Sequence, residues 1–185
     1  MKKQPLRVGF DLDGVILYNP ARVVRPLISL AKRLFLSKRK LAFYYPHSPF
    51  EKMMWKLFHL SSIYISSGMD DIKKLAKEKK MKAYIVTARY GFLGDDFKKW
   101  VKRNNIDLVF DGVYYNKDDE QPHLFKERMI RKLNLDVYVE DNYDVVKYLS
   151  QKKNAKIIWI YNMFDFYLRQ AYKFPSLKKA VQSLL

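Results

Sequence analysis

The chain has 185 residues, 49 % of them hydrophobic, which is enough length and apolar content to build a core and excludes a disordered chain. It contains no cysteine, which excludes disulfides and thiolate metal sites and fits a reducing, cytoplasmic location. No run of 18 apolar residues is present, so we expect no membrane-spanning helix. The net charge of +17 predicts attraction to anions but does not say which anion.

A short buried strand is predicted near the amino terminus, where Leu6, Val8 and Phe10 alternate with other residues. Charged residues interrupt this stretch, so we expect it to open the first strand and not to be a secretory signal. Asp11 and Asp13 follow directly. Because residues two apart in extended backbone point to the same side, the two carboxylates should converge at the carboxyl end of the strand.

Residues 18–67 interrupt the pattern and are predicted to form a small helical insert. Helices are expected over about 20–36 and 50–60, separated by a basic stretch and an aromatic one. The segment carries nine Lys or Arg residues against one acid, Glu51, and is much more basic per residue than the remainder. It is therefore the part of the chain most suited to attract an anion.

Strands and helices alternate after the insert, which predicts a doubly wound α/β fold with a parallel sheet and right-handed crossovers. Ser176, directly after Pro175, is the expected N-cap of the last helix. The predicted helices cover about 70–80, 95–104, 123–133, 143–151 and a stretch from 176, and the predicted strands cover 83–87, 108–115, 136–141 and 156–161.

Polar residues stand at the carboxyl ends of three of the predicted strands. They are Asp11 with Asp13, Thr87, and Glu140 with Asp141. In open parallel sheets, functional sites lie beyond the carboxyl ends of the strands, so these residues are expected to meet. Carboxylates together with a hydroxyl suit phosphoryl transfer, which requires a nucleophile, charge neutralisation and a proton donor.

The sequence Phe-Asp-Leu-Asp-Gly-Val at 10–15 resembles the first motif of the haloacid dehalogenase (HAD) superfamily of phosphatases. The resemblance implies a three-layer Rossmann-like core. It also implies that Asp11 attacks phosphorus and that Asp13 serves as general acid and base. The expected cofactor is Mg²⁺, held in part by Asp11 and by the backbone carbonyl of Asp13.

Two further motifs of the family have counterparts. Thr87-Ala88-Arg89 resembles the second motif, in which the hydroxyl binds the phosphoryl oxygen. Arg89 could grip phosphate bidentately or could be a solvated charge at a helix start. The third motif is a lysine that neutralises charge. Lys126 stands at the matching place, and Lys117 in the preceding loop is the rival.

The stretch from Glu140 to Asp144 resembles the fourth motif, the acidic pair that holds Mg²⁺. Asp141 is the first choice for the direct ligand and Glu140 is the alternative. Asp144 is an outer partner of the site or part of the first helical turn, where acids are favoured anyway. The Ile-Val-Thr-Ala-Arg and Glu-Asp-Asn segments and the place of the insert are similar to the branch of bacterial 5′(3′)-deoxyribonucleotidases.

The position of the insert resembles that of a C1-type cap, so residues 1–17 and 68–185 are predicted to form the catalytic core and 18–67 the cap. Such a lid would exclude water and contribute specificity. His47 and His59 have no partner at metal-ligand spacing, and surface or half-buried roles are expected for both. The aromatic side chains of the insert could stack on a base or form the core of a helical hairpin: Phe43, Tyr44, Tyr45, Phe50, Trp55 and Phe58.

The first functional expectation is a Mg²⁺-dependent phosphomonoesterase that acts on a small anionic phosphorylated substrate such as a nucleotide. A second is a phosphatase acting on nucleic-acid ends, for which binding should weaken steeply with salt. A third is a basic binding protein without catalysis, which two unpaired carboxylates at 11 and 13 argue against. The sequence shows no recognised nucleic-acid-binding module.

Overall fold

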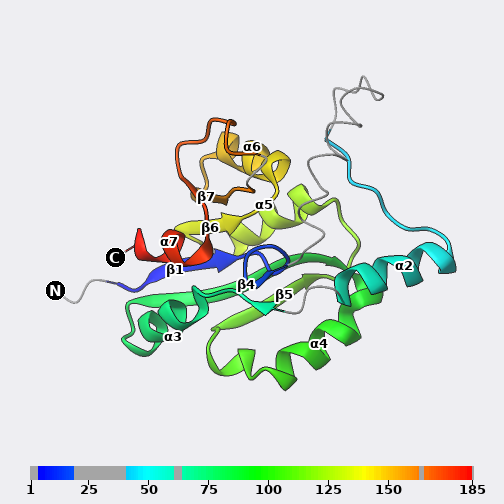
Figure 1. Ribbon diagram of the computed structural model, residues 1–185, viewed down its shortest axis with the longest axis horizontal. Helices are drawn as coiled ribbons and strands as arrows, with labels where there is room; N and C mark the ends of the chain where they lie inside the picture. Colours follow the sequence, from blue (N-terminus) through cyan, green and yellow to red (C-terminus); the bar gives the residue numbers. More distant parts are fainter. Residues whose placement is uncertain (1–3, 19–40, 61–63, 163–164, 185) are drawn as a thin grey trace.

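The computed structural model describes residues 4–18, 41–60, 64–162 and 165–184. Within them, a six-stranded sheet has the order β5-β4-β1-β6-β7-β8, and every neighbouring pair is parallel (Figure 1). The strands are β1 (Leu6–Phe10), β4 (Met81–Tyr90), β5 (Gly112–Asn116), β6 (Val137–Glu140), β7 (Lys156–Ile160) and β8 (Lys173–Phe174).

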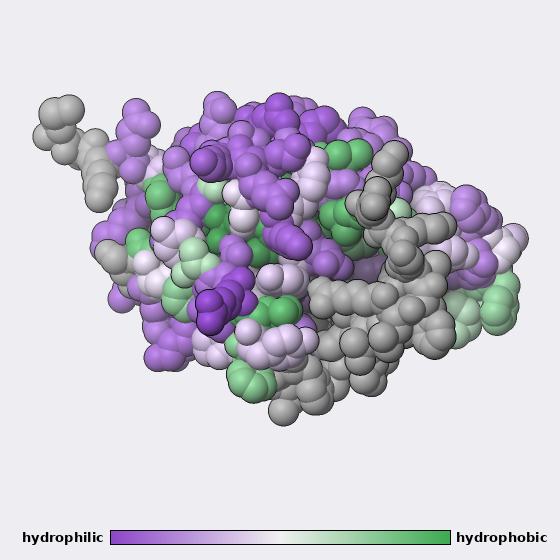
Figure 2. Space-filling model, turned by 90° about the horizontal axis from the view of Figure 1, so that it is seen from above, coloured by the Kyte–Doolittle hydropathy of each residue, from purple (hydrophilic) through white to green (hydrophobic). Residues whose placement is uncertain are grey.

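Helices cover both faces of the sheet, which confirms the predicted three-layer α/β architecture. Side chains from α3 (Met69–Lys77), α4 (Gly94–Arg103) and α7 (Leu177–Gln182) pack on one face, and those from α5 (Pro122–Lys132) and α6 (Tyr143–Lys152) pack on the other. None of the described helices has the length and apolar content needed to cross a membrane. Figure 2 shows hydrophilic residues over much of the surface on the side that it presents.

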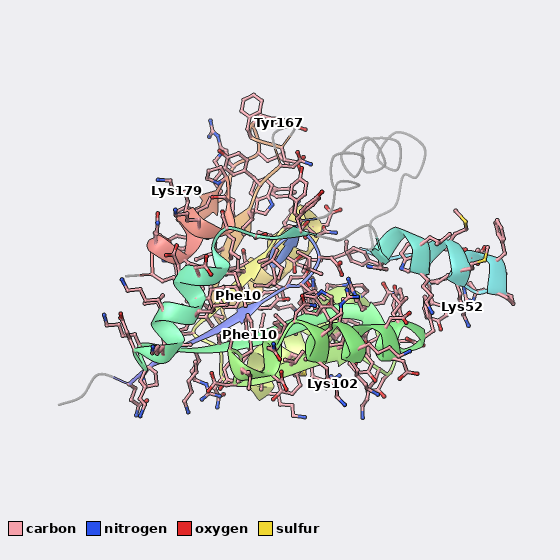
Figure 3. The ribbon with its side chains drawn as sticks, turned by 60° about the horizontal axis from the view of Figure 1, so that its bottom comes forward. Phe10, Lys52, Lys102, Phe110, Tyr167 and Lys179 are labelled. Carbon is pink, nitrogen blue, oxygen red and sulfur yellow. The ribbon has the colours of Figure 1, made fainter. Side chains whose placement is uncertain are left out.

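The strands form a buried sheet because their apolar side chains alternate between two separate cores. Val8 and Phe10 of β1 enter the core under α3, where Phe10 meets Phe110 edge-on at a ring distance of 6.2 Å (Figure 3). Tyr138 of β6 enters the opposite core. Gly9 lies against its ring, since a Cβ on that glycine would come within 2.8 Å of Tyr138. The sheet is thus buried on both faces, as its apolar strands require.

Most predicted elements are present with shifted ends. The strand predicted over 108–115 begins only at Gly112, because Ile106–Leu108 forms a short 3-10 helix and Phe110 turns into the core. The two-residue strand β8 was not predicted, since it is too short to show alternation. Ser176 caps α7 as expected, its hydroxyl accepting from the backbone N–H of Lys179. The helix predicted over 20–36 lies outside the described residues.

The insert is represented by α2 (Pro49–Leu60), close to the helix predicted over 50–60. The chain leaves and rejoins the sheet domain through a small antiparallel ribbon, β2 (Leu17–Tyr18) with β3 (Tyr64–Ile65). Helix α2 lies beyond the end of the sheet beside α4 (Figures 1 and 3), and an ion pair of 2.8 Å joins Lys56 to Asp96. The division into core and cap stays a prediction.

The aromatic stretch before α2 packs against the last residue of β4 and the turn that follows it. The ring of Tyr45 lies 4.9 Å from that of Tyr90 and 6.4 Å from that of Phe92. Phe50, by contrast, is 67 % exposed. Part of this aromatic set therefore attaches the insert to the sheet domain, and its predicted role in stacking on a base stays open.

Candidate active site

The order of the strands brings the sequence-predicted residues to one edge of the sheet. Strand β1 lies between β4 and β6, with Phe10 paired to Ile85 on one side and to Val139 on the other. Asp11 follows β1, Thr87 lies near the end of β4, and Glu140 ends β6 with Asp141 next to it. These side chains are all buried, so they form a polar cluster that solvent barely reaches.

Three carboxylates converge closely enough to hold a cation. Ligand oxygens of Asp11, Glu140 and Asp141 all lie within 4.8 Å of one another. Gly14 makes the approach possible: its φ is +90°, and a Cβ there would lie 2.1 Å from Oδ2 of Asp141. Oxygen donors of this kind suit Mg²⁺, so the residues present fit the predicted ion. Both acids that the sequence left as alternatives belong to the cluster.

A lysine lies inside this acidic cluster. Lys126 extends from α5 and donates to Oδ2 of Asp11 at 2.8 Å and to Oε2 of Glu140 at 2.6 Å. Burial alone would lower the pKa of Lys126, but the two carboxylates raise it above its ordinary value. Lys117, the rival in the sequence, is exposed in the loop after β5. Of these two lysines, Lys126 is therefore the one that contacts the carboxylate of Asp11.

Burial still disfavours the charged forms of Asp11 and Glu140, even with Lys126 beside them. Burial raises the pKa of Asp11, and the neighbouring Asp141 raises it further, while Lys126 opposes both effects. Burial also raises the pKa of Glu140 to about 8, again with Lys126 opposing. A divalent cation among these oxygens would favour their charged forms, because opposite charges at short range stabilise a carboxylate. The electrostatics thus agree with the donor geometry.

Asp13 has a cationic partner of its own. Arg89 forms a two-pronged ion pair with it: Nε donates to Oδ2 at 2.8 Å and Nη2 donates to Oδ1 at 2.7 Å. Burial would raise the pKa of Asp13, but Arg89 holds it well below the usual range. Arg89 itself is only 8 % exposed, so the alternative of a solvated charge at a helix start is wrong.

His59 is a residue of this site that the sequence did not reveal. It extends from α2, its Nδ1 lies 3.4 Å from Oδ2 of Asp13, and its side chain is 15 % exposed. Of the surface or half-buried roles expected for it, the structure shows the half-buried one, but the contact with Asp13 was not foreseen. No signal in the sequence could have found it, because the two residues are brought together only by the placement of α2 against the sheet.

The remaining candidates have local roles. The Thr87 hydroxyl is buried and accepts from the backbone N–H of Arg89 at 3.3 Å, and the half-buried Ala88 packs on the core below α5. Asn142 caps α6, its side chain accepting from the backbone N–H of Asp144 at 3.0 Å. Asp144 belongs to the first turn of α6, and the carboxylate cluster found among the described residues does not include it.

The parallel sheet, the helices on both faces and the acids at the ends of β1 and β6 give this chain the fold of HAD-superfamily hydrolases. A HAD-superfamily hydrolase from Ehrlichia chaffeensis is 14 % identical, with 100 % of this chain and 98 % of that one covered and a TM-score of 0.56. The HAD-hydrolase YfnB from Bacillus subtilis, solved with magnesium bound, is also 14 % identical, with coverages of 98 % and 99 % and a TM-score of 0.63.

A chain of the Pnkp1/Rnl/Hen1 RNA repair complex is similar as well, at 13 % identity and a TM-score of 0.53, with 87 % of this chain and 44 % of that one covered. No protein-family model and no curated protein sequence matches this chain. At these identities the likeness shows the fold. The deoxyribonucleotidase-like branch stays a prediction.

Proposed function

We propose that this protein is a Mg²⁺-dependent phosphomonoester hydrolase that works through an aspartyl-phosphate on Asp11. One observation carries the proposal: oxygens of Asp11, Glu140 and Asp141 lie within 4.8 Å of one another, with the ammonium of Lys126 2.8 Å from Asp11. A buried cluster of this composition is costly to fold, because taking three carboxyl groups out of water disfavours their charged forms. Such a cluster suits phosphoryl transfer, in which negative charge that develops on the transferring group must be stabilised.

In the first half of the reaction, a carboxylate oxygen of Asp11 attacks phosphorus, and the bond from phosphorus to the leaving oxygen breaks. The carboxylate is oriented for this, because Oδ1 accepts from the backbone N–H of Leu12 at 2.8 Å while Oδ2 accepts from Lys126. Asp13 donates a proton to the leaving oxygen. In the second half, Asp13 takes a proton from water, the water oxygen attacks phosphorus, and the bond to Asp11 breaks.

Proton donation by Asp13 requires that its ion pair with Arg89 loosens, because that pair favours the charged carboxylate. An arriving phosphate offers the guanidinium a second bidentate partner of higher charge. We therefore propose that Arg89 turns toward the substrate phosphate, which raises the pKa of Asp13, so that Asp13 takes up a proton from solvent and then donates it to the leaving oxygen. Thr87 and Lys126 would contact the same phosphoryl oxygens.

The bound Mg²⁺ would supply charge neutralisation at the transferring phosphoryl group. Asp11, Asp141 and the backbone carbonyl of Asp13 would hold it, with Glu140 as the alternative acid. Glu140 already accepts from Lys126 and, through Oε1, from the backbone N–H of Asn142 at 3.0 Å. These two contacts favour Asp141 over Glu140 as the direct ligand.

We propose that residues 18–67 act as a cap, because α2 brings His59 to the edge of the site. The first substrate class is a small anionic phosphate ester such as a nucleotide. A phosphatase acting on nucleic-acid ends is the second candidate. It is favoured by the net charge of +17 and by the likeness to a chain of an RNA repair complex. Its activity on oligonucleotides would fall steeply with salt.

The test is the release of inorganic phosphate from mononucleotides, sugar phosphates and 5′- and 3′-phosphorylated oligonucleotides, with Mg²⁺ or with EDTA. We expect turnover that EDTA abolishes and that Asp11→Asn lowers by at least about 1000-fold, the size of a lost nucleophile. Asp107→Asn, which removes an exposed acid elsewhere, is the matched control. Full activity of folded Asp11→Asn would refute the nucleophile, and turnover of oligonucleotides alone would select the second candidate.

A further inference from the structure

A groove lies between α2 and α4, close to Asp13, the proposed general acid. It has a volume of about 310 Å³, within the range of small-molecule sites. Arg89 and His59 are among the residues that line it, and both contact the carboxylate of Asp13. Because Asp13 would protonate the leaving oxygen, this groove lies on the side of the site that the leaving group must occupy.

The walls of the groove are two helix faces rich in basic residues. Asp96, Lys99, Trp100 and Arg103 follow one another at steps of three, one and three residues, which places them on one face of α4. Helix α2 contributes Lys56 to the opposite wall. One acid therefore stands among several cations.

Asp96, the one acid among the described residues that line the groove, already has a partner. Asp96 pairs with Lys56 across the groove at 2.8 Å. Within the described part of the chain, no carboxylate forms an ion pair with Lys99 or Arg103. Both side chains are exposed. The groove thus presents two cations, Lys99 and Arg103, that lie one helical turn apart and form no ion pair with an acid of the described residues.

We propose that this groove binds a second phosphate, carried by the leaving group of the substrate. The proposal rests on the proposed function, because the assignment of the leaving-group side depends on Asp13. Arg103 can grip phosphate with two parallel N–H donors, and Lys99 adds a point charge one turn away. Trp100 provides an apolar surface beside them, against which the ring of a nucleoside or sugar can pack.

The experiment compares kcat/KM for substrates with and without the second phosphate. The pairs are AMP with adenosine 3′,5′-bisphosphate, fructose 6-phosphate with fructose 1,6-bisphosphate, and AMP with a 5′-phosphorylated oligonucleotide. The test variant is Lys99→Ala/Arg103→Ala. The control is Lys98→Ala/Lys102→Ala, which removes the same charge from exposed positions of α4 that do not line the groove. Circular dichroism and thermal melting verify folding.

We expect wild-type protein to prefer at least one substrate with a second phosphate. The Lys99→Ala/Arg103→Ala variant should have a kcat/KM about tenfold lower on that substrate, mainly because KM rises. This magnitude is the combined effect of losing two exposed charge contacts. The same variant should stay within about twofold on the matched monophosphate, and the control within about twofold on both. Which pair responds identifies the source of the second phosphate.

Equal kcat/KM for each pair, or equal losses in the test and control variants, would overturn the groove assignment and leave the hydrolase proposal standing. No metal-dependent phosphate release from any substrate would overturn the hydrolase proposal instead. In that case, calorimetric binding of adenosine 3′,5′-bisphosphate to Asp11→Asn protein decides the groove separately. Binding that survives Lys99→Ala/Arg103→Ala unchanged would refute it.

Discussion

Lys126→Met is the most direct test of the buried cluster of Asp11, Glu140 and Asp141. The substitution removes the ammonium that lies 2.8 Å from Asp11 and 2.6 Å from Glu140 while keeping an unbranched side chain of similar length. Both carboxyl groups then remain buried without their cation. Removing one member of a buried ion pair typically costs about 3–5 kcal/mol. For a protein of this size, that corresponds to a fall in melting temperature of about 10 °C.

The loss should depend on pH in a defined direction. The pKa of Lys126 is raised above its ordinary value of 10.5, so its stabilising charge is fully present up to pH 8.5 in the wild type. In the variant, the carboxyl groups can take up protons at low pH and relieve the unpaired charge. The destabilisation should therefore be larger at pH 8.5 than at pH 5.5.

Urea unfolding and thermal melting in EDTA at both pH values measure the effect. Lys147→Met, which removes an exposed lysine from α6, is the control and should change stability by less than about 0.5 kcal/mol. Added Mg²⁺ should recover part of the loss, by about 2.7 kcal/mol at a hundred times its dissociation constant. If Lys126→Met were as stable as Lys147→Met at pH 8.5, the view of Lys126 as the cation that offsets this cluster would be wrong.

Three other perturbations follow from the same site. In EDTA, the free energy of unfolding of the wild-type protein should fall between about pH 4.5 and pH 8, by up to about 1.4 kcal/mol per pH unit. Burial raises the pKa of Glu140 to about 8, so the folded protein keeps a proton that the unfolded chain releases over this range. A free energy of unfolding in urea that does not change with pH would contradict this. Arg89→Met should lower the free energy of unfolding by about 3–5 kcal/mol at neutral pH. Arg89 holds the pKa of Asp13 below its usual value, and its stabilising effect is lost when Asp13 is protonated, so the difference from wild type should shrink only as the pH falls below about 4. A difference that stayed constant down to pH 2 would argue against this ion pair as the cause. Gly14→Ala should cost about 1–3 kcal/mol and weaken Mg²⁺ binding, as its Cβ would lie 2.1 Å from Oδ2 of Asp141 at a φ of +90°; unchanged melting with and without Mg²⁺ would show that the loop can shift.

Local pattern predicted the elements well where it was strong. The apolar alternation of β1 and the N-cap at Ser176 were both read correctly, because each depends on residues that are neighbours in the chain. The strand predicted over 108–115 was placed too early. Phe110 is apolar because it packs into the core, but it does not belong to the strand, which begins at Gly112. Propensity does not separate those two reasons for an apolar residue.

The site shows the same division. The sequence by itself determined that acids and a threonine stand near the carboxyl ends of strands in a parallel sheet, because alternation and turn residues act over a few positions. Only the tertiary structure decided that Lys126 and not Lys117 contacts Asp11, that Arg89 clasps Asp13, and that His59 reaches it from α2. Such contacts depend on strand order and on how helices seat against the sheet. Those are properties of packing between distant segments, and no short stretch of residues contains them.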